Sequence, residues 1–307
     1  MAAQAALPHL DGRTFITDGG METTLIFRDG LELPDFASFV LLDDSDGLAA
    51  LRGYYASYVA IARRHGVGII LDTPTWRGNP DWGARLGYSA DALDDVNRRG
   101  VALLEEVRAE AGDVEMLISG CIGPRGDGYV VGDAMNPEEA EAYHSAQIST
   151  FAGTSADLVS ALTLNYAEEA TGIARAAAEA GIPSVISFTV ETDGRLPSGQ
   201  ELRDAVGEVD DATDSAPAYY MVNCAHPTHF EDVLNEGGLE RVRGLRANAS
   251  MKSHAELDEA EDLDQGDPDD LAERYRAIRP LMPGLNVVGG CCGTDERHIE
   301  AICTVFG

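Results

Sequence analysis

The residues best suited to chemistry are two adjacent cysteines near the C-terminal end of the chain. Cys291 and Cys292 follow two glycines, Gly289 and Gly290, which end an apolar run. Adjacent cysteines do not readily form a disulfide with each other, because the strained ring would force the peptide bond between them out of its trans form. Glycines at a strand end allow the backbone to bend, so both thiols can be presented to one centre.

A third cysteine, Cys224, ends another apolar run. Three thiols at strand ends give the ligand set of a catalytic zinc site, which has three protein ligands and one open position. We therefore predict that Cys224, Cys291 and Cys292 bind Zn²⁺. The alternative is that these three cysteines are buried, inert thiols. We interpret the two other cysteines in that way, Cys303 on the last expected helix and Cys121 at a strand end.

His226 and His229 close to Cys224 offer a rival metal cluster. We favour instead a loop that enters a helix through Pro227, because the cysteine pair already completes a three-ligand site. The glycines between Gly120 and Gly128 lack the strand and helix context of a phosphate-binding loop and are interpreted as a surface loop. The acidic run from Glu256 to Asp270 does not match a calcium loop and is expected to be a solvated face.

Short apolar runs that alternate with longer amphipathic segments must position these thiols. The expected strands are Thr14–Thr17, Val67–Leu71, Val114–Ser119, Leu158–Leu164, Ser184–Val190, Ala218–Asn223, Val242–Arg246 and Asn286–Val288. Helical spacing is seen in Tyr54–His65, Leu93–Ala111, Pro137–Thr150, Glu168–Ala180, Pro268–Arg279 and Arg297–Val305.

About eight strand–helix units without a strong linker predict one (β/α)₈ barrel (TIM barrel) over residues 1–307. A doubly wound open sheet is the alternative. In the barrel, polar residues at the carboxyl ends of the strands face the active site. Cys224 ends the sixth strand and Cys291 and Cys292 end the eighth, so a single strand separates them.

The charge balance is strongly acidic and limits the classes of partner. Asp and Glu number 53 against 22 Lys and Arg, a formal net charge of −31 among 307 residues. Such a surface repels phosphate backbones, so no nucleic-acid partner is expected. No apolar stretch is long enough to span a bilayer, and residues 1–10 lack the pattern of a signal peptide. We expect a cytoplasmic protein, either from a high-salt cytoplasm or with an ordinary acidic surface, and leave homo-oligomer formation open.

These motifs together resemble those of the homocysteine S-methyltransferase family, over nearly the whole chain. The stretch from Gly289 to Thr294 matches that family's Gly-Gly-Cys-Cys-Gly-Thr signature, and Asn223-Cys224 matches its upstream cysteine motif. Asp18-Gly19-Gly20-Met21 is similar to its first-strand motif, and residues 58–73 follow its second unit, whose strand ends in Thr73.

The resemblance implies a zinc-dependent (β/α)₈ enzyme that methylates the thiol of homocysteine to give methionine. It places Cys224, Cys291 and Cys292 on the metal, and it implies substrate contacts from the polar strand ends Asp18, Gly19, Gly20, Thr73 and Asn223. Zinc lowers the pKa of a bound thiol, and three thiolate ligands keep the sulfur of that thiol electron-rich enough to attack a methyl group. The partners implied are a small-molecule thiol and a methyl donor.

The chain departs from the family pattern at the fourth strand. Relatives usually place a glutamate there for the amino group of the substrate, and this chain has Leu162. Glu22 stands where relatives have a small residue, and we expect it to take over as the ammonium partner. Arg77 is expected to bind a substrate carboxylate, with a surface salt bridge as the alternative. Trp76 and Trp82 either form part of a cationic donor site or simply pack.

The methyl donor is not specified by these residues. The chain is too short for the folate and cobalamin modules of larger methionine synthases, so S-methylmethionine, S-adenosylmethionine and betaine stay open. Because of Leu162, the acceptor could also be a different small thiol or a selenol. A non-catalytic zinc-binding barrel is a further alternative. A metallohydrolase of the same fold is disfavoured, because such sites prefer histidine and carboxylate ligands.

Overall fold

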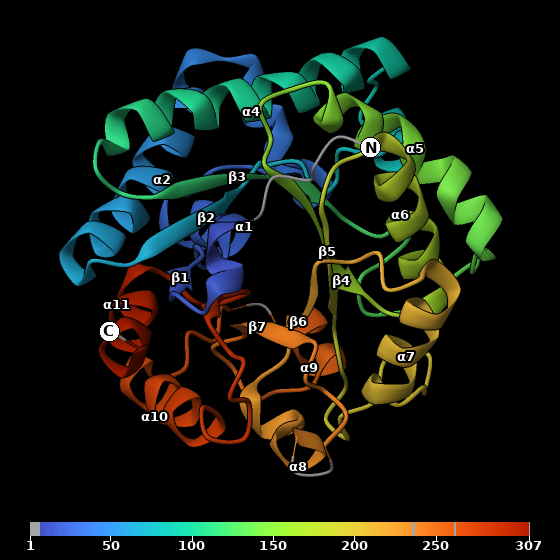
Figure 1. The fold of residues 1–307 in the computed structure, drawn as a ribbon. Coiled ribbons are helices and arrows are strands. Elements are labelled where there is room, and N and C mark those ends of the chain that lie inside the picture. The colour runs from blue at the N-terminus through green and yellow to red at the C-terminus, as the bar shows by residue number, and fades with distance from the viewer. Residues whose placement is uncertain (1–6, 235–236, 261, 307) are drawn as a thin grey trace.

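The computed structural model describes residues 7–234, 237–260 and 262–306. Eight parallel strands close into a barrel in chain order, and helices surround it (Figure 1). The strands are β1 (Phe15–Ile16), β2 (Gly68–Asp72), β3 (Met116–Ile122), β4 (Leu158–Leu164), β5 (Ser184–Phe188), β6 (Tyr219–Asn223), β7 (Val242–Ala247) and β8 (Val287–Gly290).

The first and last strands close the barrel. Phe15 of β1 pairs with Gly68 of β2 on one side and with Val287 of β8 on the other. This closure brings the loop after β1 next to the loop after β8, although the two are separated by most of the chain. The expected (β/α)₈ barrel is therefore confirmed, and the alternative of an open doubly wound sheet is wrong.

Helices follow the strands, and the long ones cover the outside of the barrel (Figure 1). They are α1 (Met21–Thr23), α2 (Ser45–His65), α3 (Pro80–Arg85), α4 (Ala90–Ala111), α5 (Pro137–Ala152), α6 (Ala167–Ala180), α7 (Leu202–Thr213), α8 (Glu231–Leu234), α9 (His254–Asp258), α10 (Pro268–Ile278) and α11 (Glu296–Phe306).

Local sequence explains where the long helices begin and end. The side chain of Asp44 accepts hydrogen bonds from the amides of Asp46 and Gly47 and so caps α2, and Asn136 forms a capping box with Glu139 at the start of α5. Gly66 ends α2 in the left-handed conformation, which costs glycine little. Because of the Asp44 cap, α2 starts nine residues before the expected Tyr54.

The eight expected strands are all present with small shifts at their ends. β4 has the predicted bounds, β1 is shorter, and β3 continues to Ile122, three residues beyond the expected end. The segment from Gly120 to Ile122 is thus buried strand, and only the residues after it form the expected loop. Helix α7 had no counterpart among the expected segments.

Two apolar layers hold the barrel together. The larger layer lies between the strands and the surrounding helices and includes Cys303 of α11, which is core as predicted. The smaller layer fills the inside of the barrel with Phe15, Ile70, Leu117 and their neighbours. Cys121 belongs to this inner layer and also borders the cavity above it.

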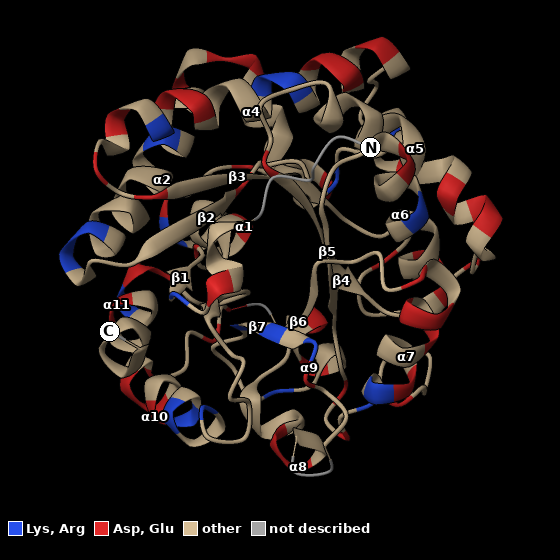
Figure 2. Cartoon of the chain, in the orientation of Figure 1, with Lys and Arg blue, Asp and Glu red and all other residues tan. Residues whose placement is uncertain are grey.

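Acidic residues, red in Figure 2, are spread over the outer helices rather than gathered on one side of the view. They include the first turns of α5, α6 and α10, where a carboxylate is stabilised by the helix dipole. None of the helices within the described residues has the length and apolar character needed to cross a membrane.

Candidate metal centre and active-site cavity

Three cysteine thiols meet at the carboxyl end of the barrel. Cys224 directly follows β6, and Cys291 and Cys292 directly follow β8. The Cys224 Sγ atom lies 2.7 Å from that of Cys291 and 3.8 Å from that of Cys292. All three sulfur atoms lie within 4.8 Å of one another, and no other group of three or more metal-ligating side chains converges in this way among the described residues.

Local backbone geometry turns the thiols toward one another. Cys224 has a φ of 55°, in the left-handed region that non-glycine residues seldom adopt. A side chain at Gly289 would place its Cβ 1.9 Å from Thr17 Oγ1, and one at Gly290 would place it 2.0 Å from Thr294 Oγ1. The two glycines are therefore required for the loop that carries Cys291 and Cys292 to pack against its neighbours.

The donor set suits a metal ion with soft ligands. A tetrahedral zinc ion with Zn–S bonds of about 2.3 Å holds its sulfur ligands roughly 3.8 Å apart, so the Cys224–Cys292 spacing already fits. The Cys224–Cys291 spacing is shorter, and a small side-chain rotation would widen it. Hydrogen bonds with Cys291 and Cys292 lower the pKa of the Cys224 thiol, whereas hydrogen bonds with Cys224 and Cys291 raise the pKa of Cys292. Full ionisation of all three thiols therefore needs a cation.

An aromatic pair covers the sulfur cluster. The Tyr129 hydroxyl lies 3.6 Å from Cys224 Sγ and 3.7 Å from Cys292 Sγ. Its ring stacks on the ring of His254 with centroids 4.0 Å apart. His254 Nε2 donates a hydrogen bond of 2.8 Å to the carbonyl oxygen of Cys224, so both side chains of this pair contact the same ligand residue. Tyr129 belongs to the loop after β3, which thus lies over the cavity.

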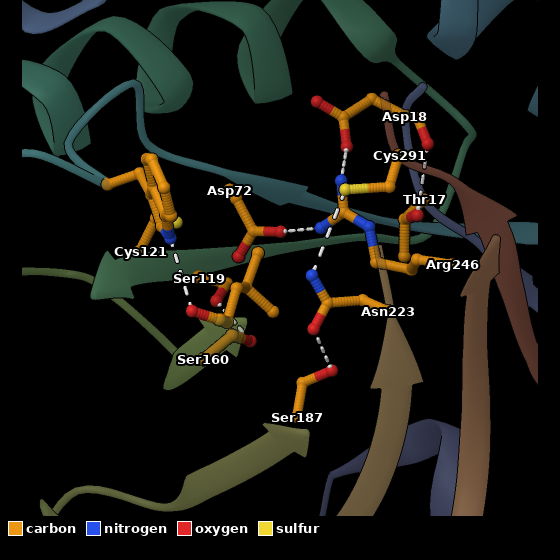
Figure 3. A network of polar contacts seen from close by, with 12 residues as sticks. Thr17, Asp18, Asp72, Ser119, Cys121, Ser160, Ser187, Asn223, Arg246 and Cys291 are labelled. Atoms are coloured by element: carbon orange, nitrogen blue, oxygen red, sulfur yellow. Dashed lines mark hydrogen bonds and ion pairs between the residues drawn. The ribbon is translucent and has the colours of Figure 1, made fainter. Parts of the chain in front are cut away.

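Asn223 connects three strands to the cysteine cluster. Its Nδ2 donates to Thr163 Oγ1 at 2.8 Å and points toward Cys291 Sγ at 3.8 Å. Its Oδ1 accepts from the hydroxyl of Ser187 at 2.6 Å and from the amide of Thr163. With both amide atoms engaged inside the protein, Asn223 fixes the end of β6 next to the cysteine (Figure 3).

A buried charge network lies beside the thiols. Arg246, at the end of β7, donates to Asp18 Oδ1 at 2.5 Å and to Asp72 Oδ2 (Figure 3). Arg246 Nε also donates to the Gly290 carbonyl at 3.2 Å, which links the network to the cysteine loop. Burial raises the pKa of Asp18 to about 7, although Arg246 acts in the opposite direction. The network carries two carboxylates for one guanidinium.

The thiols and this network open into one cavity of about 550 Å³. All of the residues expected at the site line it, namely Asp18, Gly19, Gly20, Glu22, Thr73, Arg77, Asn223, Cys224, Cys291 and Cys292. Leu162 lines it as well, which leaves that wall of the cavity without the carboxylate of the family pattern. The Thr73 hydroxyl is held by Thr75 Oγ1 at 2.6 Å and by the Cys121 amide at 2.9 Å.

Arg77 is buried at 7% exposure, so the alternative of a surface salt bridge is wrong. Its guanidinium lies over the rings of Trp76 and Trp82, at 4.1 Å and 3.7 Å from their centroids. Trp82 also contacts the guanidinium of Arg85. The two tryptophans therefore stack on cations of the protein, and both also line the cavity. Their part in a cationic donor site stays a prediction.

The rival histidine cluster is not formed. His226 accepts a hydrogen bond from the amide of Thr228 and caps a short 3-10 helix, and His229 contacts the Met251 carbonyl at 3.0 Å. The acidic run from Glu256 to Asp270 is mostly exposed as expected, apart from residue 261, which lies outside the described residues. The same run also borders the cavity through Asp258, Asp262 and Asp264, which was not foreseen.

Three functional neighbours escaped the sequence analysis. Arg246 had a usable signal, because a charged residue between the apolar Leu245 and Ala247 of a strand needs a buried partner. Tyr129 and His254 had no such signal, since each lies in a loop or short helix far in sequence from the cysteines. Their proximity to Cys224 follows only from how the loops after β3 and β7 fold over the barrel.

Comparisons with known proteins agree with this geometry. Residues 15–306 match the family model described as homocysteine S-methyltransferase. The methionine synthase of Mycobacterium tuberculosis is 27% identical over 223 residues, and that of Mycobacterium leprae is 26% identical over 236 residues. Each match covers 69% of this chain and 18% of the relative, so the chain spans less than a fifth of the length of these curated relatives.

Solved structures show the same fold. The metallated form of the homocysteine methyltransferase MmuM from Escherichia coli superposes with a TM-score of 0.72 at 21% identity, covering 95% of this chain and 96% of that chain. The oxidized form of that protein gives a TM-score of 0.74 at 20% identity, with 95% of each chain covered. At this level of identity, the likeness concerns the fold.

Proposed function

Because the chain belongs to the homocysteine S-methyltransferase family, we propose that it is a zinc-dependent enzyme that transfers a methyl group from a small donor to homocysteine, giving methionine. One observation carries the proposal. The thiols of Cys224, Cys291 and Cys292 converge within 4.8 Å at the floor of a cavity. A site with three protein ligands leaves room for a substrate atom on the ion.

The proposal of zinc rests on the chemistry of the ligands. Three thiolates form a soft set that zinc accepts in tetrahedral geometry. When bound, zinc lowers the pKa of a substrate thiol and keeps its sulfur in the nucleophilic thiolate form. The Tyr129 hydroxyl and the amide of Asn223 point at the sulfur ligands and would hold their orientation.

The rest of the cavity would bind and orient the two substrates. Asp18, Gly19, Gly20, Glu22, Thr73, Arg77 and Asn223 are proposed to surround the acceptor thiol, with the last of these acting through Cys291. Holding the sulfur and the methyl carbon in line converts a reaction between two molecules into one within a complex, which is where most of the acceleration would arise.

The charge of the cavity favours a cationic methyl donor. Its lining carries eight carboxylates against two arginines. Four of the carboxylates, Asp127, Asp258, Asp262 and Asp264, come from the loop after β3 and from the acidic run after β7. Such a lining attracts a sulfonium or quaternary ammonium group. S-methylmethionine, S-adenosylmethionine and betaine all satisfy this requirement.

Leu162 supports a second candidate, in which the acceptor is another small thiol or a selenol. It lines the cavity at the place where the family pattern has a carboxylate. An acceptor without an amino group would not need that carboxylate. The assay that separates the candidates combines each of the three donors with homocysteine, other small thiols and a selenol.

The experiment begins with zinc stoichiometry of the purified protein and continues with that panel. We expect about one zinc per chain and methionine as the product with at least one donor. Methylation of another acceptor in preference to homocysteine would favour the second candidate. A zinc-loaded protein that methylates nothing on the panel would contradict an enzymatic role and leave a zinc-binding barrel.

A further inference from the structure

Arg77 is a buried cation that faces the cavity without an anionic partner. Its Nη1 donates to the Gly126 carbonyl at 3.0 Å, and its Nε has no hydrogen-bond partner in the part of the chain that the structure describes. Among the described residues, no carboxylate oxygen lies within 4.0 Å of the guanidinium. Stacking on two tryptophans fixes the plane of the guanidinium. A charge that is buried and held in this way without a counter-ion is costly unless a ligand supplies one.

Glu22 presents the opposite charge to the same cavity. Its Oε1 accepts a hydrogen bond of 2.8 Å from the Ser38 hydroxyl, and no Lys, Arg or His side chain pairs with it within the described part of the chain. Burial raises the pKa of Glu22 above its usual value, and the neighbouring charge of Cys291 acts in the same direction. Glu22 in turn contributes to the electrostatic environment of Arg77.

The other charged residues at the floor of the cavity are already paired. Arg246 holds both Asp18 and Asp72, and Asp18 also accepts a hydrogen bond from the Tyr54 hydroxyl at 3.1 Å. The other carboxylates of the lining are the exposed Asp35, Asp127, Asp258 and Asp262 and the half-buried Asp264. Among the described residues, the half-buried Glu22 and the buried Arg77 thus have no charged partner on the wall of a cavity whose floor is the cysteine cluster.

We propose that Glu22 and Arg77 recognise the two charged ends of an α-amino acid, with Glu22 binding the ammonium group and Arg77 the carboxylate. The thiol of the same molecule would reach the metal held by the cysteines. This inference rests on the proposed function, since it specifies the acceptor as a thiol-bearing α-amino acid. It also explains how the cavity recognises an amino group with a leucine at position 162.

A binding experiment with two truncated acceptors tests the assignment. 4-Mercaptobutanoate is homocysteine without its amino group, and 3-aminopropane-1-thiol is homocysteine without its carboxylate. Their dissociation constants are measured by calorimetric titration of the zinc-loaded protein. The wild type should bind each analogue roughly 10- to 100-fold more weakly than homocysteine, the range expected for one hydrogen bond to a charged group.

The variants should lose discrimination in a crossed pattern. Glu22→Gln should bind homocysteine and 4-mercaptobutanoate about equally while still rejecting the aminothiol. Arg77→Gln should bind homocysteine and 3-aminopropane-1-thiol about equally while still rejecting 4-mercaptobutanoate. Arg85→Gln is the matched control, because it removes the other cation over Trp82, is well exposed and lies outside the cavity lining. It should leave both preferences unchanged. Equal zinc content in all variants shows that each has folded.

Two results would overturn the assignment. One is a Glu22→Gln protein that keeps its full preference for homocysteine over the amine-free thiol. The other is an Arg77→Gln protein that keeps its preference over the carboxylate-free thiol. Failure of the proposed function looks different, because a wild-type protein that binds zinc and homocysteine but transfers no methyl group leaves the two preferences measurable.

Discussion

Gly20 in the loop after β1 lies directly against the backbone of Cys291 in the loop after β8. A Cβ atom at Gly20 would come within 2.6 Å of the Cys291 carbonyl oxygen and 2.4 Å of Thr23 Oγ1. The Gly20 amide also donates to the Thr294 carbonyl at 3.0 Å, in the same loop as the cysteines. The first-strand motif therefore supports the proposed metal centre by leaving room for the loop that carries two of its proposed ligands.

Gly20→Ala should therefore weaken metal binding while the barrel stays folded. The added methyl group must push on backbone, which cannot give way as a flexible side chain would, so Cys291 should move. We expect zinc affinity to fall by tenfold or more, as seen when groups that orient metal ligands are removed. Chelator competition measures the affinity, and circular dichroism checks the fold. Gly53→Ala, whose Cβ would meet nothing within 4 Å, is the control and should bind zinc like the wild type.

Cys292→Ser should abolish stoichiometric zinc. The substitution removes one of three thiolates from the cluster, and a neutral hydroxyl is a poor ligand for this ion. Metal analysis by mass spectrometry should give well below one zinc per chain. Cys303→Ala, a buried thiol of α11 away from the cluster, should keep full occupancy. Zinc retained at full occupancy by Cys292→Ser would contradict the assignment of Cys292 as a ligand.

Local patterns were sufficient to predict the barrel and the convergence of the three cysteines. Eight apolar runs separated by amphipathic segments leave few folds, and parallel strands in chain order place Cys224 near the two later cysteines. Gly289 and Gly290 marked the end of a strand because the backbone there has no room for a side chain. The order of the strands specifies which residues become neighbours at the carboxyl end of the barrel.

Loop conformation was beyond the reach of the sequence. Tyr129 is 95 residues from Cys224, and its hydroxyl reaches the sulfur only because the loop after β3 folds inward. The burial of Arg77 was likewise not predictable, and the sequence left two alternatives for its side chain, a surface salt bridge and a contact with a substrate carboxylate. Its burial depends on Trp76 and Trp82 coming together around it. No spacing rule encodes that packing.

Arg246→Met should be strongly destabilising. The change removes the cation that is shared by Asp18 and Asp72 and leaves two buried carboxylates beside each other without a counter-charge. Breaking a buried ion pair from one side typically costs about 3–5 kcal/mol. Urea unfolding near neutral pH, followed by circular dichroism, measures the loss of unfolding free energy.

A variant in which the whole network is neutral separates the cost of buried, unpaired charge from the cost of lost packing. In Arg246→Met combined with Asp18→Asn and Asp72→Asn, no uncompensated charge is buried, so much of the lost stability should return. A triple variant that is no more stable than Arg246→Met would show that the cost comes from packing around the side chain of residue 246.

His9 at the bottom of the barrel provides a pH-dependent contribution to stability. It is fully buried between Phe15 and Tyr219, with ring centroids 5.4 Å and 5.1 Å away, and neither ring nitrogen has a hydrogen-bond partner among residues 7–234, 237–260 and 262–306. Burial, helped by the positive charge of Arg243, lowers the pKa of His9 to about 4. The folded protein thus holds this histidine neutral over a range in which the unfolded chain protonates it.

We predict that His9 makes the protein less stable as the pH falls from about 6.5 toward 4. In this window the unfolded state binds more protons than the folded state, so the unfolding free energy rises with pH, by at most about 3 kcal/mol in total. His9→Phe keeps an aromatic ring and removes the titration. Its stability relative to wild type, from urea unfolding, should therefore be roughly 2 kcal/mol more favourable at about pH 5 than at about pH 7.5. A difference between variant and wild type that stays constant across this range would show that His9 titrates normally in the folded protein.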